Sequence, residues 1–146
     1  MITPKEKQVK EKRISSWKTP YFYHYVGRAD RLYQLLDECV NVCFQSGRNG
    51  CPGNNDSGGL SSCYMWNFLG IFPVTGQDIM MLGSPKAKEM FIRFHNGNSL
   101  TIKKVGDGKN VTAVMLNGRK IDDYFLKVND IMQGGILEFY YNKKEI

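Results

Sequence analysis

The sequence lacks several features that would place it in a broad class at once. No apolar run approaches the roughly 20 residues that cross a bilayer, which argues against a membrane-spanning protein. The first thirteen residues are rich in Lys and Arg and contain no apolar core, so no secretory signal peptide is visible. Localisation is therefore left open by the sequence.

Close-range metal ligands are also scarce. The two histidines, His24 and His95, lie far apart, and the four cysteines include no Cys-x-x-Cys pair. A zinc site needs four ligands at close range, so the sequence does not predict one. Buried apolar thiols are the better interpretation. One disulfide stays possible among the four cysteines, which are Cys39, Cys43, Cys51 and Cys63.

The positive charge has no nucleic-acid pattern. The net charge of +6 and the isoelectric point near 9.1 would suit an anionic partner. Part of the excess lies in the first thirteen residues, however, and the rest is mixed with Asp and Glu. No stripe of Lys and Arg alternates with aromatic residues that could stack on bases. We therefore expect no nucleic-acid partner, although a small basic binding protein remains an alternative.

Apolar spacing predicts helices in the first half of the chain. Positions Leu32, Leu35, Leu36, Cys39, Val40 and Cys43 recur at helical intervals and predict a helix from Ala29 to about Phe44. A second helix is expected from about Leu60 to Leu69, closed by Gly70. It is apolar nearly all round, so it should be buried. The aromatic segment Trp17 to Tyr25 should be buried as well.

After residue 78 the pattern changes to short strands and turns. Strands are expected at 79–82, 90–94, 99–103, 111–116 and 136–141, with an Asn117-Gly118 hairpin turn. A short helix at 129–132 would be capped by Asn129 and stopped by Gly134-Gly135. This order predicts an α+β fold in two layers, two or three helices on an antiparallel sheet. Residues 1–16 would form a charged leader, and 17–146 the α+β unit.

One polar loop could carry chemistry. Cys51 to Gly59 (CPGNNDSGG) joins the two predicted helices and holds a carboxylate, Asp56, at the start of the second. Asn-Asn-Asp-Ser-Gly is ordinary turn and helix-cap composition, so Asp56 could simply accept backbone N–H groups. A carboxylate held in its charged form there would also suit a general base that activates water.

A family resemblance bears on that choice. The run Pro52 to Val74 (PGNNDSGGLSSCYMWNFLGIFPV) resembles the glycoside hydrolase family 92 signature Pro-Gly-Asn/Asp-x-Asp-x-Gly-Gln, followed by a helix ending in Leu-Gly-Phe-Tyr-Pro-Val. Further motifs match in order over about residues 17–142. They are Pro20-Tyr21-Phe22-Tyr23 with Tyr25 and Gly27, Gly83-Ser84-Pro85, Leu116-Asn117-Gly118, Asp130-Ile131, Gly134-Gly135 and Leu137-Glu138-Phe139.

The resemblance implies a function. Family 92 enzymes are calcium-dependent, inverting exo-α-mannosidases of bacteria, usually periplasmic or at the cell surface, built on an (α/α)6 barrel. They hydrolyse mannose-containing glycans with two carboxyl groups, an acid and a base. By position, Asp56 matches the general base and Asn54 the neighbouring residue that supports it. On this resemblance, the chain corresponds to the end of the barrel and the strands that follow it.

Departures from the family pattern limit the expected activity. The family's Asn-Glu-Pro-Ser-His-His is Arg13 to Lys18 here, its motif Gln is Gly59, and the Trp of the following helix is Cys63. The general acid and most calcium ligands have no counterpart in this chain. We therefore expect a fragment or remnant that is inactive alone and binds no calcium by itself. It would need an N-terminal barrel partner or form a homodimer. The alternative is a non-catalytic module that binds carbohydrate or protein.

Overall fold

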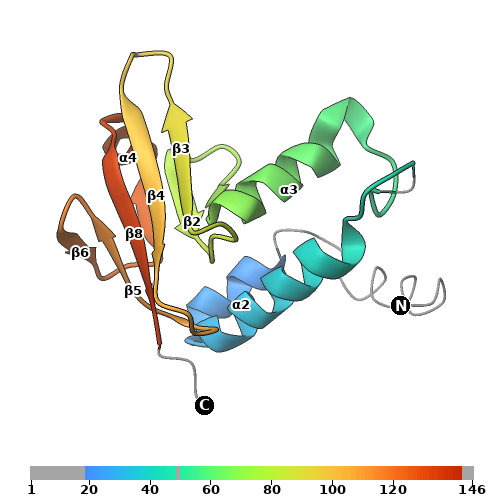
Figure 1. The fold of residues 1–146 in the computed structure, drawn as a ribbon, viewed down its shortest axis with the longest axis horizontal. Coiled ribbons are helices and arrows are strands. Elements are labelled where there is room, and N and C mark those ends of the chain that lie inside the picture. Colours follow the sequence, from blue (N-terminus) through green and yellow to red (C-terminus); the bar gives the residue numbers. More distant parts are fainter. Residues whose placement is uncertain (1–18, 49, 143–146) are drawn as a thin grey trace. The chain divides into compact units, whose positions relative to one another are not determined.

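The computed structural model describes residues 19–48 and 50–142, and the chain divides into two compact units, Met1–Met65 and Trp66–Ile146 (Figure 1). The predicted leader at 1–16 lies outside the described residues. No helix within the described part is long and apolar enough to cross a membrane.

Two helical segments come first among the described residues of the first unit. The 3-10 helix η1 (Thr19–Val26) precedes α2 (Ala29–Glu38), which continues into the π-helical turn η2 (Cys39–Cys43). The predicted helix from Ala29 to about Phe44 is thus confirmed as one continuous helical run. Its buried face carries the apolar positions that predicted it, namely Leu32, Leu36, Cys39, Val40 and Cys43.

The prediction that the aromatic segment is buried is correct only in part. Tyr21 and His24 are buried, whereas Phe22 and Tyr25 are 63% and 66% exposed. A 3-10 helix has three residues per turn, so residues three apart share a face. The ring contacts follow this rule, because Tyr21 contacts His24 and Phe22 contacts Tyr25. Trp17 lies outside the described residues.

The helix α3 (Gly59–Leu69) follows the 3-10 turn η3 (Asp56–Gly58) and contains the boundary between the units. Its predicted burial is wrong: Asn67 is its buried residue, while Met65 is 53% exposed. Trp66 and Leu69 are partly buried against the core of the second unit. The helix ends as predicted at Gly70, whose φ of +79° suits glycine.

The second unit contains two sheets (Figure 1). The smaller has the antiparallel order β1-β2-β7, formed by β1 (Ile71–Pro73), β2 (Ile79–Leu82) and β7 (Phe125–Lys127). The larger has the order β3-β4-β8-β5-β6, formed by β3 (Glu89–Arg93), β4 (Ser99–Val105), β5 (Val111–Leu116), β6 (Arg119–Ile121) and β8 (Gly135–Tyr141). The short helix α4 (Val128–Met132) precedes β8.

The predicted α+β class is confirmed, with two corrections of detail. The larger sheet is mixed rather than wholly antiparallel, because β4 and β8 run parallel. Residue alternation identifies a strand but not the direction of its neighbour. The cap of α4 is Lys127 rather than Asn129, and it makes no side-chain cap bond.

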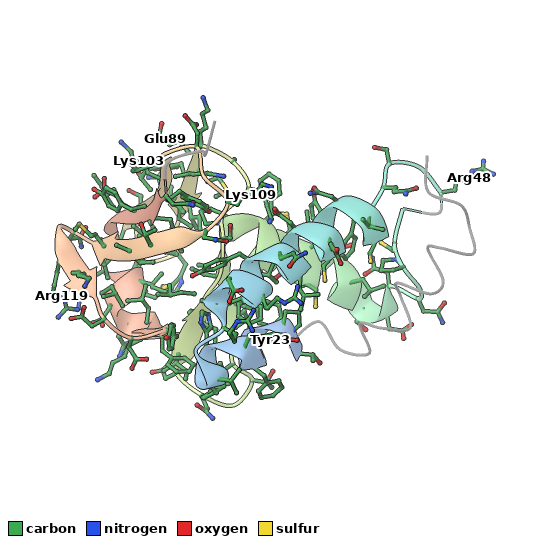
Figure 2. The ribbon with its side chains drawn as sticks, turned by 90° about the horizontal axis from the view of Figure 1, so that it is seen from below. Tyr23, Arg48, Glu89, Lys103, Lys109 and Arg119 are labelled. Carbon is green, nitrogen blue, oxygen red and sulfur yellow. The ribbon has the colours of Figure 1, made fainter. Side chains whose placement is uncertain are left out.

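Leu100, Ile102, Leu137 and Phe139 are fully buried and form the centre of the second unit's core. They alternate along β4 and β8, the two parallel strands at the middle of the sheet. On the exposed side of the sheet, Glu89 and Lys103 are cross-strand neighbours, and their Oε1 and Nζ atoms lie 3.2 Å apart (Figure 2).

Candidate functional site

The loop that carries the predicted site residues is held at both ends within the first unit. The Phe44 ring, just after η2, lies 5.0 Å from the Tyr64 ring on α3. Within the loop, the backbone N–H of Gln45 donates to the carbonyl of Gly50 over 2.9 Å. The segment between η2 and α3 is therefore a closed loop rather than an extended linker.

Asn55 clamps this loop to α3. Its Oδ1 accepts a hydrogen bond from the backbone N–H of Ser61 at 3.0 Å, and its Nδ2 donates to the Ser61 hydroxyl at 2.8 Å. The first N–H groups of a helix have no partner inside the helix. Asn55 satisfies one of them from across the η3 turn, so it acts as the cap of α3. No pattern in the sequence singled out this residue from its neighbours in the loop.

Asp56 is left out of the capping. It is exposed, and within the described part of the chain its carboxylate makes no hydrogen bond. The expectation that this carboxylate accepts backbone N–H groups is therefore wrong, because the Asn55 amide takes that place. Only the Asp56 backbone is engaged, its carbonyl accepting the N–H of Gly59. The carboxylate is open to water and to a ligand.

Asn54 lies two residues before Asp56 and makes no hydrogen bond with it among the described residues. It is exposed. After Asp56, Ser57 adopts a left-handed conformation with φ of 50°, which turns the chain into α3. The geometry thus presents Asn54 and Asp56 on an exposed turn in front of a helix, with Asn55 as the anchoring residue.

No metal site is formed by the donor groups in the described part of the chain. No group of three His, Cys, Asp or Glu residues is placed to hold an ion there. Of the four cysteines, Cys39 and Cys43 are buried as predicted, and Cys51 and Cys63 are half-buried.

Tyr21, which belongs to the aromatic motif shared with the family, has a structural role. It is fully buried, and this burial raises the pKa of its hydroxyl, with a smaller contribution from the nearby Cys39 and Cys63 thiols. A buried tyrosine kept neutral is suited to packing rather than to proton transfer at neutral pH.

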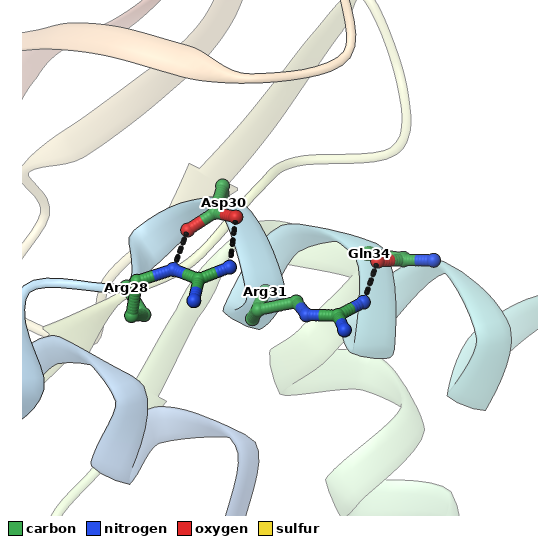
Figure 3. A network of polar contacts seen from close by, with 4 residues as sticks. All are labelled: Arg28, Asp30, Arg31 and Gln34. Carbon is green, nitrogen blue, oxygen red and sulfur yellow. Dashed lines mark hydrogen bonds and ion pairs between the residues drawn. The ribbon is translucent and has the colours of Figure 1, made fainter.

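A polar network lies at the start of α2 (Figure 3). Arg28 donates two hydrogen bonds of 2.8 Å to the Asp30 carboxylate, and Arg31 donates one of 2.8 Å to Gln34. The Arg28 hydrogen bonds lower the pKa of Asp30 to about 2. Because both partners of the ion pair are exposed, it contributes little to stability.

The matched motifs of the second unit also have structural roles. Gly83, Ser84 and Pro85 are buried, and the Ser84 hydroxyl lies 2.8 Å from the Tyr141 hydroxyl. The predicted Asn117-Gly118 turn joins β5 to β6, with φ of 52° and 76° at the two residues. Such motifs identify a fold, and Asp56 remains the candidate for chemistry.

Solved structures share the fold of this chain. The family GH92 alpha-mannosidase BT3965 from Bacteroides thetaiotaomicron, in complex with mannoimidazole, matches with a TM-score of 0.81 and 26% identity over 88% of this chain and 17% of that one. The family GH92 inverting mannosidase BT2199 of the same organism matches with a TM-score of 0.75 and 23% identity over 86% and 18%. The chain therefore shares the fold of the matching segment of these enzymes.

The family follows from the sequence. The model of the glycosyl hydrolase family 92 catalytic domain matches residues 3–143, so the chain belongs to that family. An uncharacterized secreted glycosidase of Arthroderma benhamiae is 26% identical over 136 residues, which cover 89% of this chain and 18% of that protein. The chain thus spans less than a fifth of the length of these relatives.

Proposed function

We propose that this chain supplies the general-base segment of an exo-acting, inverting α-mannosidase that acts on mannose-containing glycans. The observation that carries the proposal is the free, exposed carboxylate of Asp56, on a loop that Asn55 fixes to α3. Membership of family 92 supports the reaction class, as do the structural neighbours named as mannosidases.

The chemistry assigned to Asp56 is the activation of water. Its carboxylate takes a proton from a water molecule, whose oxygen attacks the anomeric carbon as the glycosidic C–O bond breaks. The leaving oxygen must receive a proton from a separate acid, roughly 6.5–9.5 Å from the base in an inverting site. We assign that acid to parts of the enzyme outside this chain, such as an N-terminal barrel. Asn54 would orient the base or the sugar.

The 146-residue chain alone should be inactive, because one carboxylate cannot run a mechanism that needs two. Calcium, implied by the family resemblance, would likewise be held by groups elsewhere. The test is hydrolysis of an aryl α-mannoside by the pure chain, with and without added calcium. We expect no turnover above buffer. Turnover that Asp56→Ala abolishes would contradict the proposal that the general acid lies outside this chain.

A chimera tests the role of Asp56 directly. Residues 19–142 would replace the matching segment of the Bacteroides thetaiotaomicron α-mannosidase whose structure they resemble. If the chimera is active, Asp56→Asn should lower kcat about 100-fold to 10,000-fold, the usual contribution of a general base. Asp107→Asn, at another exposed loop, is the matched control and should leave the rate unchanged. An active chimera insensitive to Asp56→Asn would refute the assignment.

The second candidate function is a non-catalytic module that binds carbohydrate or protein. Gly59 and Cys63, where the family has Gln and Trp, favour it, because a working site depends on the groups that orient its catalytic residues. NMR titration of the chain with a mannose disaccharide separates the two candidates. Shifts in the backbone signals of residues 53–57 would favour the catalytic segment, and shifts confined to other surfaces would favour the module.

A further inference from the structure

The edge strand β3 is longer than the other edge strands of the two sheets. In the order β3-β4-β8-β5-β6, β3 pairs with β4 alone. Proteins commonly protect edges with short strands, with Pro or with charged side chains, especially Lys. Among the described strands, β1 ends in Pro73, β6 is three residues long with Arg119 and Lys120, and β7 is three residues long and ends in Lys127. β3 has five residues and neither Lys nor Pro.

The backbone of β3 leaves three residues with outward hydrogen-bonding groups. At both ends of β3, the hydrogen bonds to the β4 side involve even-numbered residues. The Lys88 carbonyl accepts the Lys104 N–H, and the Phe94 N–H donates to the Asn98 carbonyl, both at 2.8 Å. Antiparallel ladders alternate. Met90 and Ile92 therefore bond towards β4, while Glu89, Phe91 and Arg93 direct their N–H and C=O groups away from the sheet.

The same three residues share one exposed face. Side chains alternate along a strand, so Met90 and Ile92 pack against the core while Glu89, Phe91 and Arg93 face outward. Phe91 is 67% exposed, as much as any large apolar side chain of the described residues. Glu89 pairs with Lys103 on β4, but Arg93 lies opposite Ser99 and has no carboxylate within salt-bridge distance among the described residues.

We infer that β3 pairs with β3 of a second copy of this chain, antiparallel and about a twofold axis at Phe91. This register places Phe91 against the partner's Phe91 and Glu89 against the partner's Arg93. It uses all three outward-facing residues and gives Arg93 the carboxylate that its own sheet does not provide. Centring the axis on Glu89 or on Arg93 would oppose like charges, which destabilises cross-strand pairs. Among registers with the axis on an outward-facing residue, charge thus selects the one centred on Phe91 for a two-fold dimer.

Charge reversal with rescue tests the inference on the 146-residue chain by sedimentation equilibrium. We expect a dimer that Glu89→Arg or Arg93→Glu alone weakens by about tenfold or more, because each change opposes two like-charge pairs. An equimolar mixture of the two variants should restore dimerisation, since position 89 and position 93 of each chain then face an opposite charge on the other chain. Arg119→Glu, on the opposite edge strand β6, is the matched control and should leave the affinity unchanged.

Amide exchange gives a second readout that does not depend on charge. The N–H of Phe91 should become protected as protein concentration rises, whereas the N–H of Ile92, bonded to β4, should be protected at every concentration. Circular dichroism verifies that each variant is folded. A chain that stays monomeric at high concentration would overturn the inference. So would a dimer that neither reversal weakens, because its interface would lie on another surface, such as α3.

Discussion

At the residue scale, Asn117 connects two separate parts of the second unit, the β5–β6 turn and the start of β8. It occupies the left-handed first position of the β5–β6 turn, with φ of 52°. Its Oδ1 accepts the N–H of Ile136 at 2.8 Å, and its Nδ2 donates to the carbonyl of Gly134 at 3.1 Å. The side chain lies so close to Gly135 that a Cβ there would come 1.9 Å from Oδ1. The two matched motifs, Leu-Asn-Gly and Gly-Gly, therefore form one structural unit.

Asn117→Ala should lower the free energy of unfolding by about 2–5 kcal/mol. The change removes the partners of two backbone groups, at about 1–3 kcal/mol, and places alanine in a left-handed conformation, at about 1–2 kcal/mol. Urea unfolding followed by circular dichroism measures the difference. Asn129→Ala, at an exposed position on α4, is the control and should stay within about 0.5 kcal/mol of the unchanged chain.

Asp30 allows a pH prediction at the same scale. Its pKa is about 2 in the folded chain, below the ordinary 3.8, because Arg28 hydrogen-bonds the charged form. A lowered pKa means that the ion pair stabilises the fold above about pH 4 and that this contribution is lost as pH falls towards 2. NMR titration of the Asp30 carboxyl carbon should give a midpoint near 2, and Arg28→Ala should raise it towards 3.8. An unchanged midpoint in Arg28→Ala would contradict the assigned cause.

At the element scale, the start of α3 depends on one amide. Asn55 caps the helix across the η3 turn and fixes the loop that carries Asp56. Loss of a side-chain cap costs about 0.5–2 kcal/mol, typically about 1. The cap therefore couples the stability of the helix to the position of the candidate base.

Asn55→Ala should destabilise the chain by about 1 kcal/mol, as a lost helix cap does. Asn54→Ala is the matched control, because Asn54 is exposed and makes no side-chain hydrogen bond within the described residues, and it should change stability by less than about 0.5 kcal/mol. Thermal unfolding of both variants decides between them. Equal losses would show that the cap has been assigned to the wrong asparagine.

The elements were predictable where the sequence signal is local. Helical spacing indicated α2 with η2, alternation indicated β2, β3, β4, β5 and β8, and Asn117-Gly118 indicated its turn. The strands β1, β6 and β7 were not predicted, because three residues are too few to show a period. The parallel pairing of β4 with β8 depends on the path of the chain, which no local pattern encodes.

The candidate site was predictable by position but not by contact. The resemblance singled out Asp56, and the structure adds that its carboxylate is exposed and not engaged in a hydrogen bond. Three neighbouring residues, Asn54, Asn55 and Asp56, all have cap-forming side chains. Which of them reaches Ser61 depends on the backbone of the η3 turn, and composition does not specify that geometry.

At the scale of the whole molecule, self-association through β3 would link stability to concentration. A dimer that forms only from folded chains raises Tm as protein concentration rises, by mass action. When the protein concentration is raised from micromolar to high micromolar, Tm should rise by a few degrees. Phe91→Lys should remove this dependence, because it places two positive charges opposite each other at the axis. Differential scanning calorimetry at several concentrations makes the comparison. A concentration-dependent Tm that Phe91→Lys retains would place the association elsewhere.

The position of β8 bears on how the protein is made. β8 lies between β4 and β5 in the larger sheet and contributes the fully buried Leu137 and Phe139. During synthesis, β3 and β4 can pair as a hairpin, and so can β5 and β6, but the two hairpins have no shared neighbour until residues 135–141 have been translated. The two half-sheets therefore emerge from the ribosome with apolar faces uncovered, and β8, which is translated after both, joins them.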